Sequence, residues 1–108
     1  MTENNTITEF GISQKVLEQI QFKIKEFPEF TEAKIFGSRA IGNFKKVSDI
    51  DIAINGENVG FNTVARLHED LEEKISTPLF FDVVSLKNLE NLNLKNHIQQ
   101  YGKLILKK

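Results

Sequence analysis

The chain has 108 residues, of which 40% are hydrophobic and 27% are charged, and its formal net charge is −1. This length suits one domain with one core, the composition excludes wholesale disorder, and the charge balance gives no reason to expect direct nucleic-acid binding. The sequence has no cysteine, no long apolar run and no signal-peptide pattern. We therefore expect a cytoplasmic domain spanning residues 1–108, with no disulfide and no contact with a membrane.

Helical periodicity marks the region before residue 28. Ser13 is a suitable N-cap, and Pro28 would stop the helix that follows it. One stripe of this helix is apolar and would pack on a sheet; it consists of Val16, Leu17, Ile20, Ile24 and Phe27. Residues 13–27 are therefore predicted to form an amphipathic helix.

Two short strands are predicted next, with a glycine-serine turn between them. Residues 33–36 would deliver Gly37 and Ser38 at the end of one strand, and residues 39–44 would form a turn of helix broken by Gly42. Eleven residues lie between Gly37 and Asp49, too few for a parallel crossover, so the two strands should be antiparallel. The glycine-serine turn and the start of the second strand would then meet in space.

A second helix, a third strand and a last helix complete the predicted order. Asn62 or Thr63 can cap the second helix, which forms the crossover to the third strand. Residues 79–84 are apolar on both faces except for Asp82, which predicts a central strand. Gly102 would end the last helix, and residues 104–106 would pack against the body. The predicted fold class is α/β (α+β): a small mixed sheet of three or four strands, flanked by helices.

The second strand begins with two carboxylates. Because side chains alternate along a strand, Asp49 and Asp51 would point to one face while Ile50, Ile52 and Ile54 point into the core. Two carboxylates on one face can hold a hard cation such as Mg²⁺ together with substrate phosphates. The turn at Gly37-Ser38 offers N–H groups and a hydroxyl, which are donors for a polyphosphate. This pattern indicates a metal-phosphate site.

The motif Gly37-Ser38, a gap of ten residues and Asp49-x-Asp51 resembles the signature of the nucleotidyltransferase superfamily that includes DNA polymerase β. The neighbouring Arg39 and the order of helices and strands also fit this family. The short chain is similar to the minimal nucleotidyltransferases, which are the small partners of HEPN proteins in two-gene prokaryotic modules. The resemblance spans most of the chain and implies a polymerase β-like fold.

The resemblance implies a role for each residue of the motif. Asp49 and Asp51 would hold Mg²⁺ against the phosphates of ATP or another NTP, and Gly37-Ser38 would grip the terminal phosphates, with Arg39 as a further phosphate ligand. Asp82 would be a third carboxylate that completes a second metal site or takes the proton from the acceptor hydroxyl. Independently of the family, an ionised carboxylate within an apolar strand is costly unless it is paired or metal-bound.

Each of these residues also has a purely structural interpretation. Arg39 can equally be an ordinary surface residue, and Asp82 can be the partner of a nearby lysine or arginine. His68, His97 and Tyr101 lie on or near apolar stripes of helices and are predicted to be packing residues. The phenylalanines are predicted to lie in the core.

Two functions of different classes follow. The first is a nucleotidyltransferase that moves a nucleoside monophosphate, AMP from ATP, onto a hydroxyl of a partner protein, acting as the antitoxin of a HEPN toxin. The alternative is a nucleotide-binding module that neutralises its partner by contact alone. Both readings are compatible with a homo- or hetero-oligomer. A third reading, an orphan domain of a polymerase-like assembly, is less favoured.

Overall fold

A four-stranded sheet with the strand order β3-β2-β1-β4 carries the fold. The computed structural model describes residues 6–108. Its elements follow in the order α1 (Gln14–Lys25), β1 (Phe30–Phe36), α2 (Ser38–Ile41), β2 (Ile50–Gly56), α3 (Phe61–Lys74), β3 (Phe81–Ser85), a short 3-10 helix (Leu86–Asn88), α4 (Leu92–Tyr101) and β4 (Lys103–Lys107). β1 pairs antiparallel with β2 and β4, whereas β2 and β3 are parallel. The predicted mixed sheet flanked by helices is therefore confirmed.

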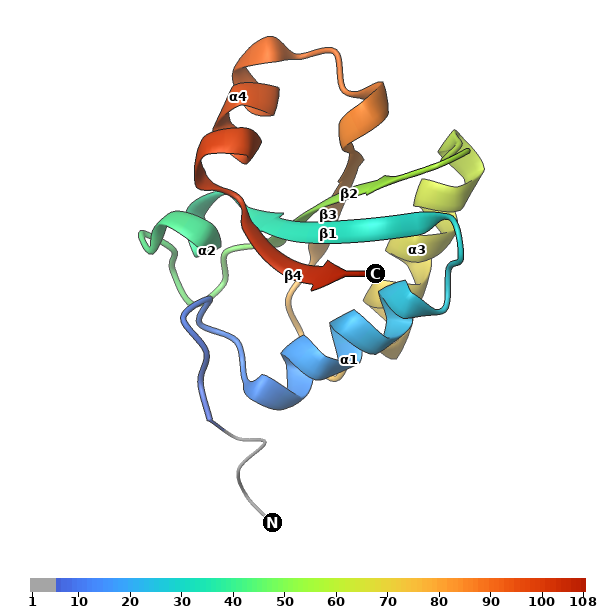
Figure 1. The fold of residues 1–108 in the computed structure, drawn as a ribbon. Coiled ribbons are helices and arrows are strands. Elements are labelled where there is room, and N and C mark those ends of the chain that lie inside the picture. Colours follow the sequence, from blue (N-terminus) through green and yellow to red (C-terminus); the bar gives the residue numbers. More distant parts are fainter. Residues whose placement is uncertain (1–5) are drawn as a thin grey trace.

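Helices cover both faces of the sheet. α1 and α3 lie on one face, and α4 lies on the other (Figure 1). Ile50, Ile52 and Ile54 alternate along β2, are each 0% exposed, and belong to the larger core under α1 and α3. Phe36 and Ala53 point to the opposite face, where they form a smaller core with Ile98 of α4. The alternation predicted for β2 is thus observed, and it directs the intervening residues to the α4 side.

The helix boundaries follow local capping chemistry. The Ser13 hydroxyl accepts the N–H of Val16 as predicted, although α1 ends at Lys25, before Phe27. α3 begins at Phe61 with Gly60 as its N-cap, so Asn62 and Thr63 lie inside the helix that they were predicted to cap. α4 ends at Gly102 as predicted, and its N-cap Asn91 accepts the N–H of Leu94.

One prediction about the sheet was wrong, and another was incomplete. β3 was predicted to be a central strand but is an edge strand; its apolar residues Val83 and Val84 pack into the cores on the two faces of the sheet, which says nothing about strands beside it. Residues 104–106 were predicted to pack against the body, and they also lie in β4, a strand beside β1 that was not predicted. Ile105 and Leu106 are buried in the core, whereas Leu104 is 51% exposed.

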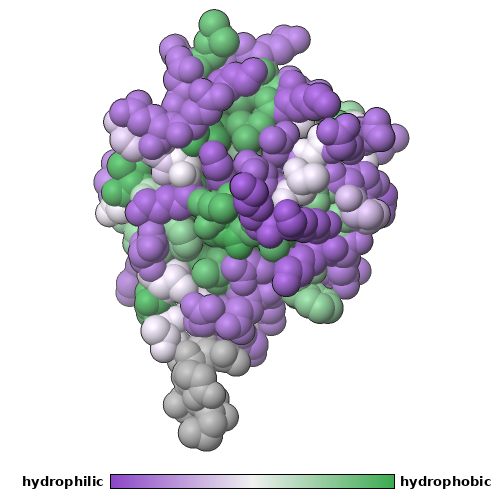
Figure 2. Space-filling view, in the orientation of Figure 1, coloured by the Kyte–Doolittle hydropathy of each residue, from purple (hydrophilic) through white to green (hydrophobic). Residues whose placement is uncertain are grey.

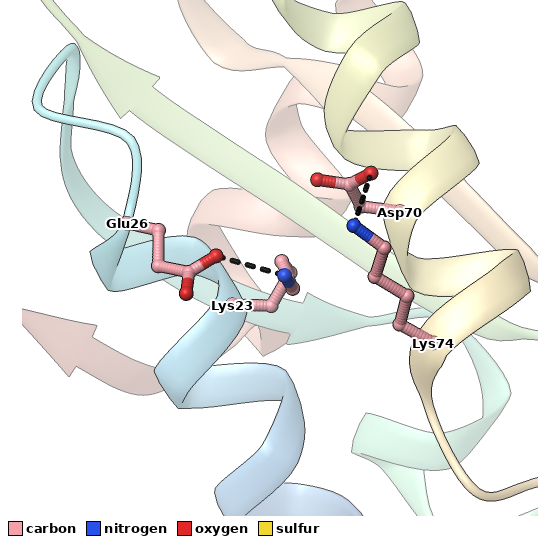
Figure 3. A network of polar contacts seen from close by, with 4 residues as sticks. All are labelled: Lys23, Glu26, Asp70 and Lys74. Atoms are coloured by element: carbon pink, nitrogen blue, oxygen red, sulfur yellow. Dashed lines mark hydrogen bonds and ion pairs between the residues drawn. The ribbon is translucent and has the colours of Figure 1, made fainter.

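The surface is mainly hydrophilic on the face shown in Figure 2, with apolar residues in patches between charged and polar ones. Ion pairs lie on the helical layer below the sheet: Lys23 with Glu26 of the α1 C-cap at 2.8 Å, and Lys74 with Asp70 of α3 at 3.7 Å (Figure 3). Glu26 and Asp70 both raise the pKa of Lys23. Within residues 6–108, no helix has the length and apolar character needed to cross a bilayer.

Five of the nine phenylalanines are buried, three are exposed and Phe44 is half-buried, so the prediction that all of them form the core was wrong. Phe10, Phe27, Phe30, Phe36 and Phe81 are buried. Phe22, Phe61 and Phe80, by contrast, are each at least 66% exposed. Phe22 lies on the outer side of α1, while Phe61 and Phe80 occupy the first residue of α3 and the residue before β3. At these positions the ring is largely exposed to solvent, so an aromatic side chain alone does not identify a core residue.

This division predicts very different costs for the same substitution. Phe30→Ala should lower the free energy of unfolding by about 3–5 kcal/mol, because it removes a fully buried ring. Phe61→Ala removes a ring that is 86% exposed and should change stability by less than about 0.5 kcal/mol. Urea denaturation of the two variants measures both values, and equal losses would contradict the assignment of the core.

Candidate active site

Three carboxylates lie near one another at one end of the sheet, where the charges of Asp49 and Asp82 both act on Asp51. Asp49 immediately precedes β2, and Asp51 is the second residue of that strand. Asp51 is the register partner of Asp82 on β3 and of Phe36 on β1. Because partners in neighbouring strands point to the same face, Asp51 and Asp82 both lie on the side of the sheet that α4 covers. Asp82 is exposed on its edge strand and Asp51 is half-buried.

The glycine-serine turn packs directly against this carboxylate group. Gly37 follows Phe36, the register partner of Asp51, and has φ of 74° and ψ of −154°, a conformation that favours glycine. A Cβ atom at Gly37 would collide with Oδ2 of Asp51. The predicted meeting of the turn with the start of β2 is thus observed.

Ser38 begins α2 beside the carboxylates and is half-buried. The carbonyl oxygen of Gly37 accepts the N–H groups of Ala40 and Ile41, at 3.1 and 3.2 Å. The backbone N–H of Ser38 has no protein acceptor in the part of the chain that the structure describes. This N–H is therefore available to a ligand at the turn.

Arg39 is placed differently from its predicted role as a phosphate ligand. Its side chain is 1% exposed and stacks on Phe44, with 4.9 Å between the guanidinium carbon and the ring centroid. Its nitrogens donate to four backbone carbonyl oxygens at 2.9–3.4 Å, those of Phe10, Lys45, Lys46 and Ser48. Four of the five N–H groups of this guanidinium donate to carbonyls, and the side chain is buried away from solvent, so Arg39 serves the structure of the site rather than facing a phosphate.

The charges at the site are unfavourable for a carboxylate. Burial, together with the negative charges of Asp82 and Asp49, raises the pKa of the Asp51 carboxyl to about 6, while Arg39 opposes the shift. Burial lowers the pKa of Arg39, and Asp51 and Asp49 counteract this effect. Ionised Asp51 is therefore held in an environment that favours a neutral group or a compensating cation.

The donor set suits a hard divalent cation, because carboxylate oxygens are the ligands that Mg²⁺ prefers. The side chains of residues 6–108 do not, however, form a preformed cluster of three or more histidine, cysteine or acidic ligands. Asp51 with its two carboxylate neighbours is thus a set of suitable donors that must adjust to surround an ion. A shallow pocket of about 250 Å³ opens beside Asp82, lined by Phe61, Val64, Ala65, His68 and Val83.

His97 contacts the turn, which its predicted role as a packing residue did not anticipate. The N–H of Gly37 donates to Nε2 of His97 at 3.0 Å, across 60 residues of sequence. His97 also packs on the rings of Phe36 and Tyr101. His68, the other histidine, lies 2.8 Å from the carbonyl oxygen of Phe81 through Nε2. The sequence placed His97 on α4 but gave no signal for its partner.

Comparisons with known proteins agree on the fold. A family model described as polymerase beta, nucleotidyltransferase, matches residues 18–108. A chain of a toxin-antitoxin structure with AMP-PNP has a TM-score of 0.73 and 21% identity, covering 85% of this chain and 73% of that one. A chain of a toxin-antitoxin MntA-HepT structure has a TM-score of 0.68 and 19% identity, covering 89% and 74%.

A third similar structure is described as tri-AMPylated Shewanella oneidensis HEPN toxin in complex with MNT antitoxin. Its matching chain has a TM-score of 0.69 and 20% identity, and the match covers 88% of this chain and 72% of that one. At these identities the likeness concerns the fold. A search of curated protein sequences found no match.

The burial of Arg39 predicts a large structural cost on its removal. Arg39→Met should lower the free energy of unfolding by about 2–4 kcal/mol, because carbonyl oxygens that it satisfies lose their donor. Arg66→Met is the matched control: Arg66 is exposed, stacks on Phe27 at 5.1 Å, and should cost less than about 1 kcal/mol. Denaturant midpoints measure both; a stable Arg39→Met protein with impaired ATP binding would instead support the phosphate role.

The raised pKa of Asp51 predicts a pH-dependent penalty in the metal-free protein. Below about pH 4 the carboxyl is protonated in both the folded and the unfolded protein, so it does not affect the free energy of unfolding. Between pH 4 and the folded-state pKa of about 6, the cost to folding grows as the unfolded state ionises first. Above that pKa the cost is constant. Asp51→Asn should therefore match wild type at pH 4 and be more stable at pH 7.5, by on the order of 1 kcal/mol after solvent screening.

Thermal melts of the metal-free protein at the two pH values test this expectation. Asp70→Asn, which alters a carboxylate of α3 paired with Lys74, is the control and should give no gain at pH 7.5. A wild-type protein that is more stable than Asp51→Asn at pH 7.5 would contradict the electrostatic description of the site.

Proposed function

Because the chain belongs to the polymerase β nucleotidyltransferase family, we propose that it transfers AMP from ATP to a hydroxyl group of a partner protein. The observation that carries the proposal is the pairing of Asp51 with Asp82 on adjacent strands, directly beside Gly37, with the charge of Asp49 acting on Asp51. Acidic ligands for a cation and donors for phosphate lie together, and this combination is what phosphoryl chemistry requires.

Asp49, Asp51 and Asp82 would hold Mg²⁺ once the carboxylates adjust around it, and a second ion is part of the proposal. When bound, Mg²⁺ would neutralise charge on the phosphate oxygens of ATP. The raised pKa of Asp51 supports this assignment, since a cation would remove the electrostatic penalty that burial, Asp82 and Asp49 impose. The N–H and hydroxyl of Ser38 would bind the terminal phosphates.

The proposed transfer is an in-line displacement at the α-phosphorus of ATP. The acceptor oxygen forms a bond to this phosphorus, the bond to the bridging oxygen breaks, and pyrophosphate leaves. Asp82 is exposed on the edge strand, so its carboxylate can be reached by an acceptor and can take the hydroxyl proton. The protein's contribution is mainly the position of the reacting groups and the electrostatics around them.

The proposed partner is a HEPN-type toxin, for which this chain would be the antitoxin. The support is the fold shared with chains from toxin-antitoxin structures, one of which contains an AMPylated HEPN toxin bound to an MNT antitoxin. The transfer of AMP to a hydroxyl of the toxin would be the neutralising act. Because the reaction consumes ATP, we place it in the cytoplasm.

A labelling experiment tests the proposal. The purified protein is incubated with Mg²⁺, ATP labelled at the α-phosphate and the protein encoded by the neighbouring gene, which the proposal expects to be of HEPN type. Label should appear on the partner, and should be absent when the ATP is labelled at the γ-phosphate. Asp49→Asn and Asp51→Asn should each lower the rate at least about 100-fold, since each removes a charged ligand of the cation.

Asp70→Asn is the matched control, because it removes a carboxylate far from the site and should leave the rate unchanged. Neutralisation of the toxin is measured in parallel with the same variants. If Asp49→Asn and Asp51→Asn neutralise the toxin as well as wild type while no label moves, the chain acts by contact alone and the proposed transfer is wrong.

A further inference from the structure

We propose that His97 is a positioning residue for the phosphate-binding turn: by accepting the N–H of Gly37, it sets the direction in which the N–H and hydroxyl of Ser38 face the terminal phosphates of ATP. This inference rests on the proposed function for its ligand. The contact on which it is built, between α4 and the end of β1, is independent of that function.

The hydrogen bonds of Gly37 fix the peptide units on both sides of it. Its N–H donates to Nε2 of His97 at 3.0 Å, which orients the peptide between Phe36 and Gly37. Its carbonyl oxygen accepts from Ala40 and Ile41, which orients the peptide that carries the N–H of Ser38. The first constraint comes from a side chain 60 residues away, and the second from α2 itself.

The turn needs a constraint of this kind because glycine supplies none. Gly37 has φ of 74° and ψ of −154°, one of many conformations that a residue without Cβ can adopt at similar energy. Asp51 Oδ2 occupies the space that a Cβ of Gly37 would need, so the glycine contacts both an acceptor on α4 and a carboxylate on β2. Without His97, the peptide between Phe36 and Gly37 would lose the hydrogen bond that orients it.

His97 is itself held firmly. Its ring packs edge-on against Phe36, with 6.2 Å between centroids, and lies 5.4 Å from the ring of Tyr101. The next residue, Ile98, is 0% exposed and anchors α4 in the smaller core. The acceptor therefore reaches Gly37 from a rigid helix, which makes it a good reference point for the turn.

The chemistry of the contact defines the test variants. Nε2 can accept only when it carries no proton, so the neutral ring has its proton on Nδ1. The Oε1 atom of glutamine can occupy nearly the same place as Nε2 and can accept the same N–H, whereas the shorter asparagine cannot reach it. His97→Phe keeps a ring against Phe36 but removes the acceptor. Gln100→Ala, at an exposed position of α4, is the control.

Two measurements on the protein test the hydrogen bond between Gly37 and His97 and its effect on ATP binding. Amide hydrogen exchange, observed by NMR without any ligand, should be about tenfold faster at Gly37 in His97→Phe and His97→Asn than in wild type. Calorimetric titration with ATP and Mg²⁺ should give an affinity about three- to tenfold weaker in the same variants, as expected for the loss of one neutral hydrogen bond. His97→Gln and Gln100→Ala should stay within about twofold of wild type in both.

In steady-state transfer to the partner, His97→Phe and His97→Asn should raise KM for ATP and leave kcat nearly unchanged, whereas His97→Gln and Gln100→Ala should change neither. Thermal melts identify any variant that fails to fold. If His97→Phe does not fold, the comparison of His97→Asn with His97→Gln still tests the inference, because both side chains are polar and only glutamine can accept the N–H of Gly37. Unchanged exchange at Gly37 in a folded His97→Phe protein would overturn the inference. So would ATP affinity that falls equally in His97→Gln and His97→Asn.

The inference and the proposed function fail in distinguishable ways. Wild-type protein that binds ATP but transfers no AMP would overturn the proposed function, while the effect of His97 on Gly37 exchange and ATP affinity would stand. Transfer that proceeds normally with unchanged KM in a folded His97→Phe protein would overturn the positioning role and leave the proposed function intact.

Discussion

The buried guanidinium of Arg39 holds the two halves of the candidate site together. It extends from α2, directly after the glycine-serine turn, and donates to the carbonyl oxygens of Lys45, Lys46 and Ser48, in the loop that leads to Asp49. A further bond to Phe10 ties in the segment before α1. Because this loop has no regular secondary structure, the guanidinium replaces the backbone partners that a helix or sheet would provide.

The same charge also moderates the electrostatics of the carboxylates. Arg39 lowers the pKa of Asp51, against burial and the two neighbouring aspartates, which raise it. The net effect is still a raised pKa, so the structure keeps an electrostatic cost at the site that a bound cation would remove. Sites that bind charged ligands commonly carry such a cost, which makes the free protein less stable than its core alone would allow.

The sequence predicted those parts of the fold that depend on local pattern. The alternation in β2 predicted that the isoleucines and the aspartates point to opposite faces. The short connection after Gly37 predicted that β1 and β2 are antiparallel and that the turn lies beside Asp51, as the structure shows. The pattern could not tell an edge strand from a central one, since apolar faces report what lies above and below a strand. For the same reason the edge position of Asp82 had to come from the structure.

Contacts between distant residues were also beyond the sequence. Arg39 appears in the motif, but whether its guanidinium turns outward or inward depends on carbonyl groups that only the folded loop brings together. His97 lies 60 residues from Gly37, and helical periodicity on α4 is equally compatible with packing or with polar contact. The roles of the site residues in catalysis remain predictions for the experiments described above.

The close approach of Gly37 to Asp51 couples the space available at the two positions. A side chain at Gly37 would occupy the space of Asp51 Oδ2, so a larger residue at one position requires a displaced or shortened residue at the other. Substitutions at such a pair are not additive, because the second change meets a site that the first has already rearranged. Shortening Asp51 would remove the collision but not the positive φ of Gly37, so position 37 would still favour glycine in a protein that lacked this aspartate.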